Sequence, residues 1–329
     1  MHVVDIHAHI VVPEITRAVL PDELWRPVVT WENGQQIVDF AGKRINSALR
    51  EFVDIETILE EQEKAGVDVV VLSAWSSLFR YDGDNDAALS TNQIQNDAIA
   101  KIIAEYGPKV AGLGTVPLQD AKGAVAELER CMNELELVGV EIGSNVTGVY
   151  LGDDRFRPFW AAAEALDAFV EIHPVPGLGG PTNREYYLWN AFANPAETTL
   201  TAAHIILSGL LEQHPKLKIC LVHGGGHLPY QIGRLDRAYE MRPEARRRIT
   251  KPPSFYLKQM YFDTVTHSQK ALAYLVDLVS PDRVLLGSDY PFDMGYERPA
   301  EIIRSLELSK KDEAQILGEN ATQILNLEV

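Results

Sequence analysis

Eight short apolar segments, each followed by a stretch of helical character, constrain the fold of this chain more than any other feature. They cover residues 3–9, 67–74, 110–117, 138–144, 169–174, 218–225, 260–265 and 283–291. Each is apolar nearly throughout, as expected for parallel strands that are buried on both faces. Helical patterns lie between them, at 55–66, 123–136 and 198–214. The alternation predicts an α/β protein with a (β/α)8 TIM barrel, and a doubly wound open sheet is the alternative.

The length of the chain agrees with one barrel domain over residues 1–329, because such barrels typically have about 250 residues plus insertions. Two connections are longer than a minimal barrel needs: residues 10–54 after the first strand and residues 175–197 after the fifth. Both join a strand to the helix that follows, so both belong at the carboxyl-terminal mouth, where long loops form substrate pockets. We expect these insertions to form such a pocket; ordinary surface insertions are the alternative.

The strong negative charge limits the possible classes of partner. The formal net charge is −17 and the sequence pI is about 4.9, which argues against nucleic acid and anionic membranes. No apolar run approaches the roughly 18–20 residues that span a bilayer, and the first residues lack the pattern of a secretory signal. Cys131 and Cys220 lie far apart and indicate no disulfide framework. We therefore expect a cytoplasmic protein.

Two histidines stand at the end of the first predicted strand. His7 and His9 are two residues apart, so their side chains point to the same face of that strand. A lone buried histidine is usually a structural residue, whereas two imidazoles side by side more often bind metal. By itself, the pair leaves both interpretations open.

Three further strand ends carry ionisable residues. His173, His223 and Asp289 end the fifth, sixth and eighth runs. In a barrel these ends meet at one mouth, where such groups indicate catalysis, and burying them without partners would cost several kcal/mol. A metal ion with bound water would satisfy them together. Three nitrogens and one carboxylate oxygen suit zinc, and manganese or iron suit this set less well.

Other polar residues near these strand ends suggest supporting roles. Asp263 lies in the seventh run and can hydrogen-bond a ligand imidazole. Glycines 224–226 can admit a substrate closely or simply form a tight turn. We expect His227 to be structural or to orient a neighbouring side chain, and His267 can line the mouth.

The motifs together resemble those of a known family. The pattern of His7-Ala-His9, His173, His223 and a Gly-Ser-Asp ending in Asp289 resembles the amidohydrolase superfamily. The runs over residues 194–239 and 283–295 resemble its decarboxylase branch, the family of α-amino-β-carboxymuconate-ε-semialdehyde decarboxylase, which also includes hydroxybenzoate decarboxylases. That branch contains hydrolases and hydratases as well.

The resemblance implies a role for each residue of the motif. It implies that His7, His9, His173 and Asp289 bind zinc, while His223 is the catalytic base and Asp289 also takes part in proton transfer. Some members with glutamate at the position of His7 favour manganese, which is the second candidate metal.

The resemblance also implies residues that bind the substrate. Arg44, or else Arg50, would hold a substrate carboxylate, and Arg234 would reach the site of a partner subunit across a homodimer. Tyr186, Trp189 and Phe292 would contact the substrate as well.

The implied reaction is non-oxidative decarboxylation of a small unsaturated or aromatic carboxylic acid. The same metal site can also support hydrolysis of a C–N bond or a lactone, which is the alternative within enzymes. A barrel without catalysis, acting as a scaffold or ligand sensor, is the alternative from another class.

Overall fold

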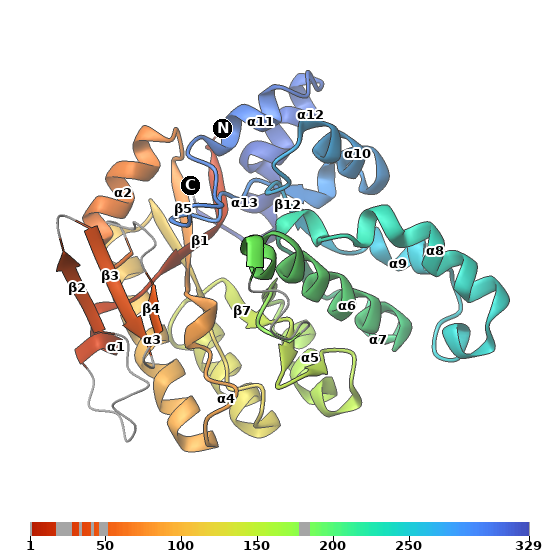
Figure 1. Ribbon diagram of the computed structural model, residues 1–329, viewed down its shortest axis with the longest axis horizontal. Helices are drawn as coiled ribbons and strands as arrows, with labels where there is room; N and C mark the ends of the chain where they lie inside the picture. Colours follow the sequence, from red (N-terminus) through yellow and green to blue (C-terminus); the bar gives the residue numbers. More distant parts are fainter. Residues whose placement is uncertain are drawn as a thin grey trace.

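The structure is a computed structural model that describes residues 2–17, 28–32, 35–40, 43–45, 52–177 and 185–328. In this part of the chain the eight predicted strands form one parallel sheet in the order β1-β5-β6-β7-β10-β11-β12-β13. Their bounds are β1 Val4–Ile10, β5 Val69–Ala74, β6 Val110–Gly114, β7 Gly139–Gly143, β10 Phe169–His173, β11 Lys218–Leu221, β12 Tyr261–Asp263 and β13 Val284–Leu285. Helices surround this sheet (Figure 1).

The sheet closes between its first and last strands. The amide of Ile6 donates to the carbonyl of Leu286 at 3.0 Å, the amide of Asp289 donates to the carbonyl of His7 at 2.9 Å, and Ala8 forms a parallel bridge with Tyr290. Closure confirms the predicted (β/α)8 barrel, and the doubly wound open sheet is wrong. It also brings the end of β1 beside the residues after β13, which positions the site described below.

The longer helices cover the outer face of the barrel. They are α2 Ile55–Lys64, α3 Asn85–Tyr106, α4 Ala121–Asn133, α5 Arg157–Ala165, α6 Asn194–Leu207, α8 Leu228–Met241 and α10 Gln269–Val279. Shorter helices are α7 Leu210–Gln213, α9 Pro253–Leu257, α11 Pro299–Arg304, α12 Lys310–Ala314 and α13 Asn320–Ile324. None of the helices in the described residues is both long and apolar enough to cross a membrane.

Two of the predicted helices are confirmed and the third is divided. The patterns at 55–66 and 123–136 correspond to α2 and α4, whereas the pattern at 198–214 is split into α6 and α7. Gly209 lies between them with φ 73°, a left-handed conformation that interrupts the helix. A Cβ atom there would lie 2.3 Å from the carbonyl oxygen of Arg248, so the close packing at this turn also requires glycine.

The amino-terminal end of the barrel is filled with apolar side chains. Val71, Leu113, Phe169 and Leu285 belong to one buried cluster that includes residues of α13 and the segment after it. A larger cluster joins the strands to the surrounding helices. The apolar packing leaves the carboxyl-terminal end of the barrel for polar chemistry.

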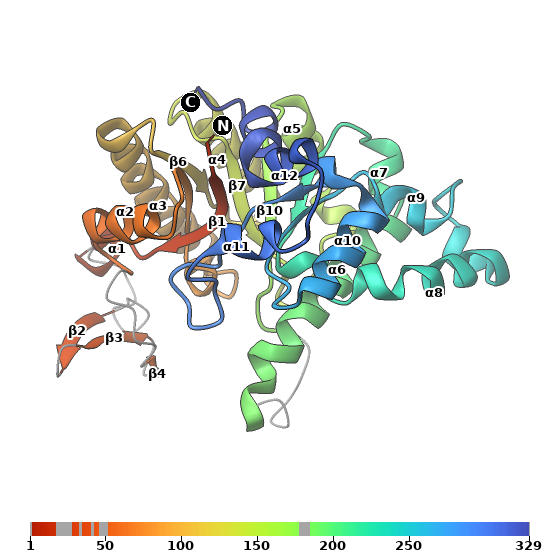
Figure 2. The ribbon, with the colours of Figure 1, turned by 90° about the horizontal axis from the view of Figure 1, so that it is seen from above.

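Both long connections carry structure of their own. The first contains α1 Pro13–Arg17 and a small antiparallel sheet of β2 Val28–Glu32, β3 Gln35–Phe40 and β4 Lys43–Ile45. The second contains a π-helical turn, Trp189–Ala193, that leads into α6. Figure 2 shows the small sheet and this turn extending on the same side of the barrel.

Candidate metal centre and active site

Strand β1 places two histidines at the mouth of the barrel. His7 and His9 are both fully buried, and the centroids of their rings lie 5.0 Å apart. The pairing of β1 with β5 shifts register between Asp5 and Ala8, and such bulges often accompany active sites because they redirect a side chain. The predicted side-by-side placement of the two imidazoles is therefore present.

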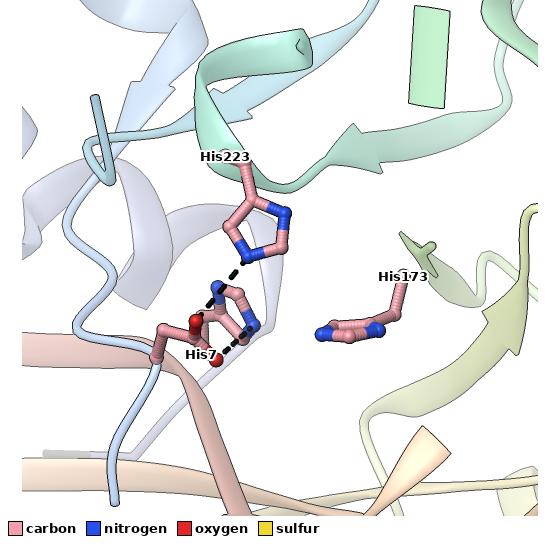
Figure 3. Close-up of side chains that lie close together, drawn as sticks. His7, His173 and His223 are labelled. Atoms are coloured by element: carbon pink, nitrogen blue, oxygen red, sulfur yellow. Dashed lines mark hydrogen bonds and ion pairs between the residues drawn. The ribbon is translucent and has the colours of Figure 1, made fainter. Parts of the chain in front are cut away.

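Three other strand ends bring their side chains to the same point. The ring centroid of His173, the last residue of β10, lies 5.5 Å from that of His7. The ring of His223, which follows β11, lies 5.3 Å from His7 and 5.4 Å from His173. Figure 3 shows the rings of His7, His173 and His223 lying close together.

The carboxylate of Asp289 lies within this histidine cluster, and its two oxygens face different histidines. Its Oδ1 atom lies 3.5 Å from Nε2 of His7 and 3.4 Å from Nε2 of His9. Its other oxygen, Oδ2, lies 3.3 Å from Nε2 of His223. One carboxylate oxygen thus faces the pair from β1, and the other faces the histidine that follows β11.

The donor atoms of this cluster fit a metal ion. The Nε2 atoms of His7 and His9 and Oδ1 of Asp289 are buried and have no hydrogen-bond partner among the described residues. Ligand atoms held tetrahedrally at about 2.0–2.2 Å from an ion lie about 3.3–3.6 Å from one another, which matches the separations of Asp289 Oδ1 from Nε2 of His7 and from Nε2 of His9. Donor atoms of His7, His173, His223 and Asp289 also lie within 4.8 Å of one another.

The remaining ring nitrogens of three histidines are fixed by hydrogen bonds. Nδ1 of His7 pairs with Asp263 at 2.8 Å, and Nδ1 of His173 donates to the carbonyl of Pro174 at 2.9 Å. Nδ1 of His9 lies 3.1 Å from the Ser73 hydroxyl, which itself donates to the carbonyl of Ala8 at 3.2 Å and so can accept from this nitrogen. Such contacts select the tautomer that leaves Nε2 free to bind a metal. The predicted hydrogen bond between Asp263 and an imidazole of the cluster is confirmed.

Burial and neighbouring charges set the protonation states of His173 and Asp289. Burial first, and then the neighbouring imidazoles of His9 and His223, lowers the pKa of His173 well below its usual range. Burial alone raises the pKa of Asp289, but the nearby imidazoles of His7 and His223 outweigh it and hold that pKa well below normal. A neutral imidazole and an ionised carboxylate are the forms that bind metal.

Two residues of the cluster have an unusual backbone. His223 has φ 55° and Asp289 has φ 60°, both in the left-handed region, which costs energy for residues other than glycine. The amide of Gly224 donates to Asp263 at 2.7 Å and helps to hold the turn that follows β11. Gly224 has φ 60°, and a Cβ atom on it would lie 2.6 Å from the Cγ2 methyl of Thr266, so both the turn and the packing around it favour glycine.

A cavity of about 650 Å³ opens onto His223 and Asp289. Gly224 and Gly226 line it, so the interpretation of these glycines as a place of close approach agrees with their position. The walls come from the turn before α6, the start of α8 and the start of α10; they include Asn190, Asn194, Pro229, Tyr230, Lys270, Tyr274 and Met294. A cavity of this size accommodates a small organic molecule.

Comparison with known proteins identifies the family. The sequence matches the amidohydrolase family over residues 4–327. It is 36% identical over 278 residues to 2-amino-3-carboxymuconate-6-semialdehyde decarboxylase from Dictyostelium discoideum, covering 84% of this chain and 77% of that protein. This chain belongs to the amidohydrolase family. The resemblance inferred from the motifs is thereby confirmed.

Solved structures of similar proteins have the same fold. This amidohydrolase superimposes on 5-carboxyvanillate decarboxylase from Sphingomonas paucimobilis with a TM-score of 0.77 and 29% identity, covering 84% of each chain. It superimposes on the corresponding enzyme from Novosphingobium aromaticivorans with a TM-score of 0.78 and 25% identity, covering 84% of this chain and 81% of that one. The second structure holds manganese and 4-hydroxy-3-methoxy-5-nitrobenzoic acid.

The predicted substrate-binding residues lie in different surroundings. Phe292 adjoins the cluster, with its ring centroid 5.3 Å from that of His9. Tyr186 is 87% exposed and Trp189 is 48% exposed, and neither lines the described cavity. Arg234 is exposed on α8 and does not line it either.

Little is known of the position of the two candidate arginines of the first insertion. The backbone of Arg44 belongs to β4, where it pairs with Asp39 of β3. Arg50 lies outside the described residues. Their proposed contact with a carboxylate stays a prediction.

Other histidines of this amidohydrolase divide into two groups. His227 and His267 both line the cavity, and the ring of His227 packs 5.1 Å from that of Phe192. His204 is exposed, and His214 is hydrogen-bonded to Glu164. The expectation that His267 lines the mouth is therefore confirmed.

Two buried carboxylic acids beneath the cluster were missed by the sequence analysis. Glu141 of β7 and Glu171 of β10 are paired in register and fully buried, and Oε2 of Glu141 lies 3.8 Å from Nδ1 of His9. Burial raises the pKa of Glu141 to about 7, against the opposing charge of His9. A glutamate inside each otherwise apolar run was the available signal.

Proposed function

We propose that this chain is a metal-dependent decarboxylase that removes CO₂ from a small unsaturated or aromatic carboxylic acid without an oxidant. The observation that carries the proposal is the carboxylate of Asp289. One of its oxygens faces the unpartnered Nε2 atoms of His7 and His9, and the other faces His223 at the cavity. The reaction follows from the relatives, which are decarboxylases of a carboxymuconate semialdehyde and of carboxyvanillate. The chain is a carboxy-lyase of the amidohydrolase superfamily.

In this proposal His7, His9, His173 and Asp289 hold one divalent metal ion. Three imidazole nitrogens and one carboxylate oxygen favour zinc, and manganese, which the Novosphingobium enzyme binds, is the second candidate. When bound, such an ion supplies Lewis-acid polarisation of substrate oxygen atoms. His223 is left out of the ligand set because its Nε2 atom faces the other carboxylate oxygen.

His223 moves the proton that the reaction requires. It lines the cavity, and its hydrogen bond to Asp289 orients the ring. Burial alone lowers the pKa of His223, but the hydrogen bond and charge of Asp289 outweigh it and raise the pKa, so the imidazole can carry a proton.

The proton goes to the carbon that bears the departing carboxylate. Protonation interrupts conjugation there, and breakage of the carbon–carbon bond restores it. The electron pair of the broken bond stays with the ring or diene, and CO₂ leaves. The net change is one proton gained by the substrate and one CO₂ released.

Arginines would hold the substrate carboxylates through paired hydrogen bonds. Arg44, or else Arg50, would do so within the chain. Arg234 is exposed on α8, where it can extend into the site of a partner subunit in a homodimer.

The direct test is an assay of CO₂ release. Purified protein would be loaded with zinc or with manganese and incubated with hydroxybenzoic acids, carboxyvanillate and carboxymuconate semialdehydes, while CO₂ and ultraviolet absorbance are followed. We expect CO₂ release in proportion to bound metal. Ring opening or ammonia release without CO₂ would instead establish the hydrolase, and protein that takes up no metal would favour a scaffold.

A further inference from the structure

We propose that Lys270, together with His267 and His227, forms a subsite for a second anionic group of the substrate. The proposal rests on the proposed function, and it narrows the substrate to an acid with two carboxylates on an unsaturated or aromatic body. One carboxylate departs as CO₂ at His223, and the other stays bound at the start of α10.

The charges around the cavity support this subsite. Its acidic and basic lining residues are His223, His227, His267, Lys270 and Asp289. Asp289 already faces the other members of the metal cluster. The remaining described wall therefore carries one ammonium group and two imidazoles without a carboxylate, although the chain as a whole has a net charge of −17. An acidic protein that binds an acidic substrate needs such a local reversal of charge.

Lys270 is available to a ligand. It is exposed, and no carboxylate among the described residues pairs with its ammonium group. Its long side chain carries three donors and can adjust to ligands of different length. A substrate carboxylate in the cavity is the partner that the described surroundings do not provide.

The position of Lys270 in its helix points to the same conclusion. α10 begins at Gln269, and the hydroxyl of Ser268 accepts the amide of Ala271 at 3.3 Å. The first turn of a helix favours acidic side chains because its free amides make that end positive. Here the first turn has no acidic residue and has Lys270 instead. The lysine therefore adds to a positive potential that does not help the helix but attracts an anion.

The other two residues are held by aromatic neighbours. The ring of His267 packs against that of Tyr296, with their centroids 4.8 Å apart. The ring of His227 packs against Phe192, and burial lowers the pKa of His227, so it contributes a neutral imidazole. Both can donate hydrogen bonds to a carboxylate without requiring a charge of their own.

The rest of the wall suits an apolar body between two carboxylates. Val265, Leu275 and Met294 line the cavity beside the polar groups. The hydroxyl of Tyr274 donates to the carbonyl of Pro229 at 3.1 Å and connects α10 with α8. This bond holds α10 against the start of α8, and residues of both helices line the cavity.

Binding of two matched acids tests the subsite directly. Isophthalate has the ring and carboxylate of benzoate plus a second carboxylate. In calorimetric titrations of metal-loaded protein, we expect isophthalate to bind roughly tenfold more tightly than benzoate, the size of a charge-assisted hydrogen bond. Lys270→Met should remove most of this preference, whereas Lys122→Met, which removes an exposed lysine of α4, should keep it. An equal preference in Lys270→Met and wild type would overturn the proposal.

Kinetics separate this subsite from the proposed reaction. With salicylate and hydroxyisophthalate as substrates, Lys270→Met should raise KM for the diacid alone and leave kcat nearly unchanged. A fall in kcat for both acids, with KM unchanged, would contradict a role in binding. If no acid releases CO₂ but the preference for isophthalate still depends on Lys270, then the subsite holds and the proposed reaction is wrong.

Discussion

The strand ends and the walls above them are built in different ways. His7, His9 and His173 are at most 6% exposed, and each has its second ring nitrogen fixed by a hydrogen bond. By contrast, Tyr186 and Trp189 of the second insertion are 87% and 48% exposed. The strand ends therefore hold the histidine cluster rigidly, while the second insertion presents open side chains; we propose that the cluster carries the chemistry and that substrate selection belongs to the helix starts and insertions.

This contrast predicts a ranking of effects. Changes to the buried histidines and to Asp289 should affect metal binding and turnover together, because hydrogen bonds and packing hold each of these side chains in a single position. Changes in the walls should affect KM more than kcat, since they touch parts of the substrate that do not react.

The largest effect should come from Asp289→Ala. This change removes an oxygen that faces His7 and His9 and the hydrogen bond to His223. We expect most of the bound metal to be lost and kcat to fall by at least about 10³-fold. Metal analysis and CO₂ release measure the two effects, with Asp277→Ala, an exposed carboxylate of α10, as control. Near-normal activity would refute the place of Asp289 in the site.

His223→Asn should separate turnover from metal binding. We propose that one oxygen of Asp289 binds the metal and the other accepts from His223. In that case the variant keeps its metal content and loses roughly 10²–10⁴-fold in kcat, the usual contribution of a proton-transfer group. Metal content and single-turnover rates distinguish the two quantities. Loss of metal along with activity would make His223 a ligand, which its closeness to His7, His173 and Asp289 also allows.

A smaller effect should follow from Asp263→Asn. The amide can still accept the bond from Gly224, but it removes the negative charge beside Nδ1 of His7. Loss of such an orienting partner typically weakens metal binding about 10–100-fold. Competition with a chelator measures the affinity, and Ser73→Ala, which removes the neutral partner of His9, should cost less. Equal losses in the two variants would show that charge at Asp263 is unimportant.

The buried part of the site was predictable from sequence, whereas the walls were predictable only at His267 and at the glycines after His223. His7, His9, His173, His223 and Asp289 come together because parallel strands end at one mouth of a barrel, so eight apolar runs were enough to place them. The start of α10 was not foreseen, because which helix residues face the mouth depends on how each helix packs on the barrel.

The two glutamates were missed for a related reason. Glu141 and Glu171 each stand inside an otherwise apolar run. Glu171 is two residues before His173, so alternation along the strand could have placed both on one face, whereas the run of Glu141 contains no such reference residue. Their pairing across β7 and β10 becomes visible only once the register of the two strands is known. The division at Gly209 likewise depends on contact with a distant segment, at Arg248.

The smallest effect we predict concerns Arg234. If it grips a carboxylate in the site of a partner subunit, Arg234→Ala should raise KM several-fold with kcat little changed, because an exposed ion contact contributes little and acts equally on the ground and transition states. Arg237→Ala, on the same helix but paired with Glu240, is the matched control and should leave KM unchanged. Steady-state kinetics and light scattering should be run together, since an active enzyme that is strictly monomeric would remove the basis for a shared site.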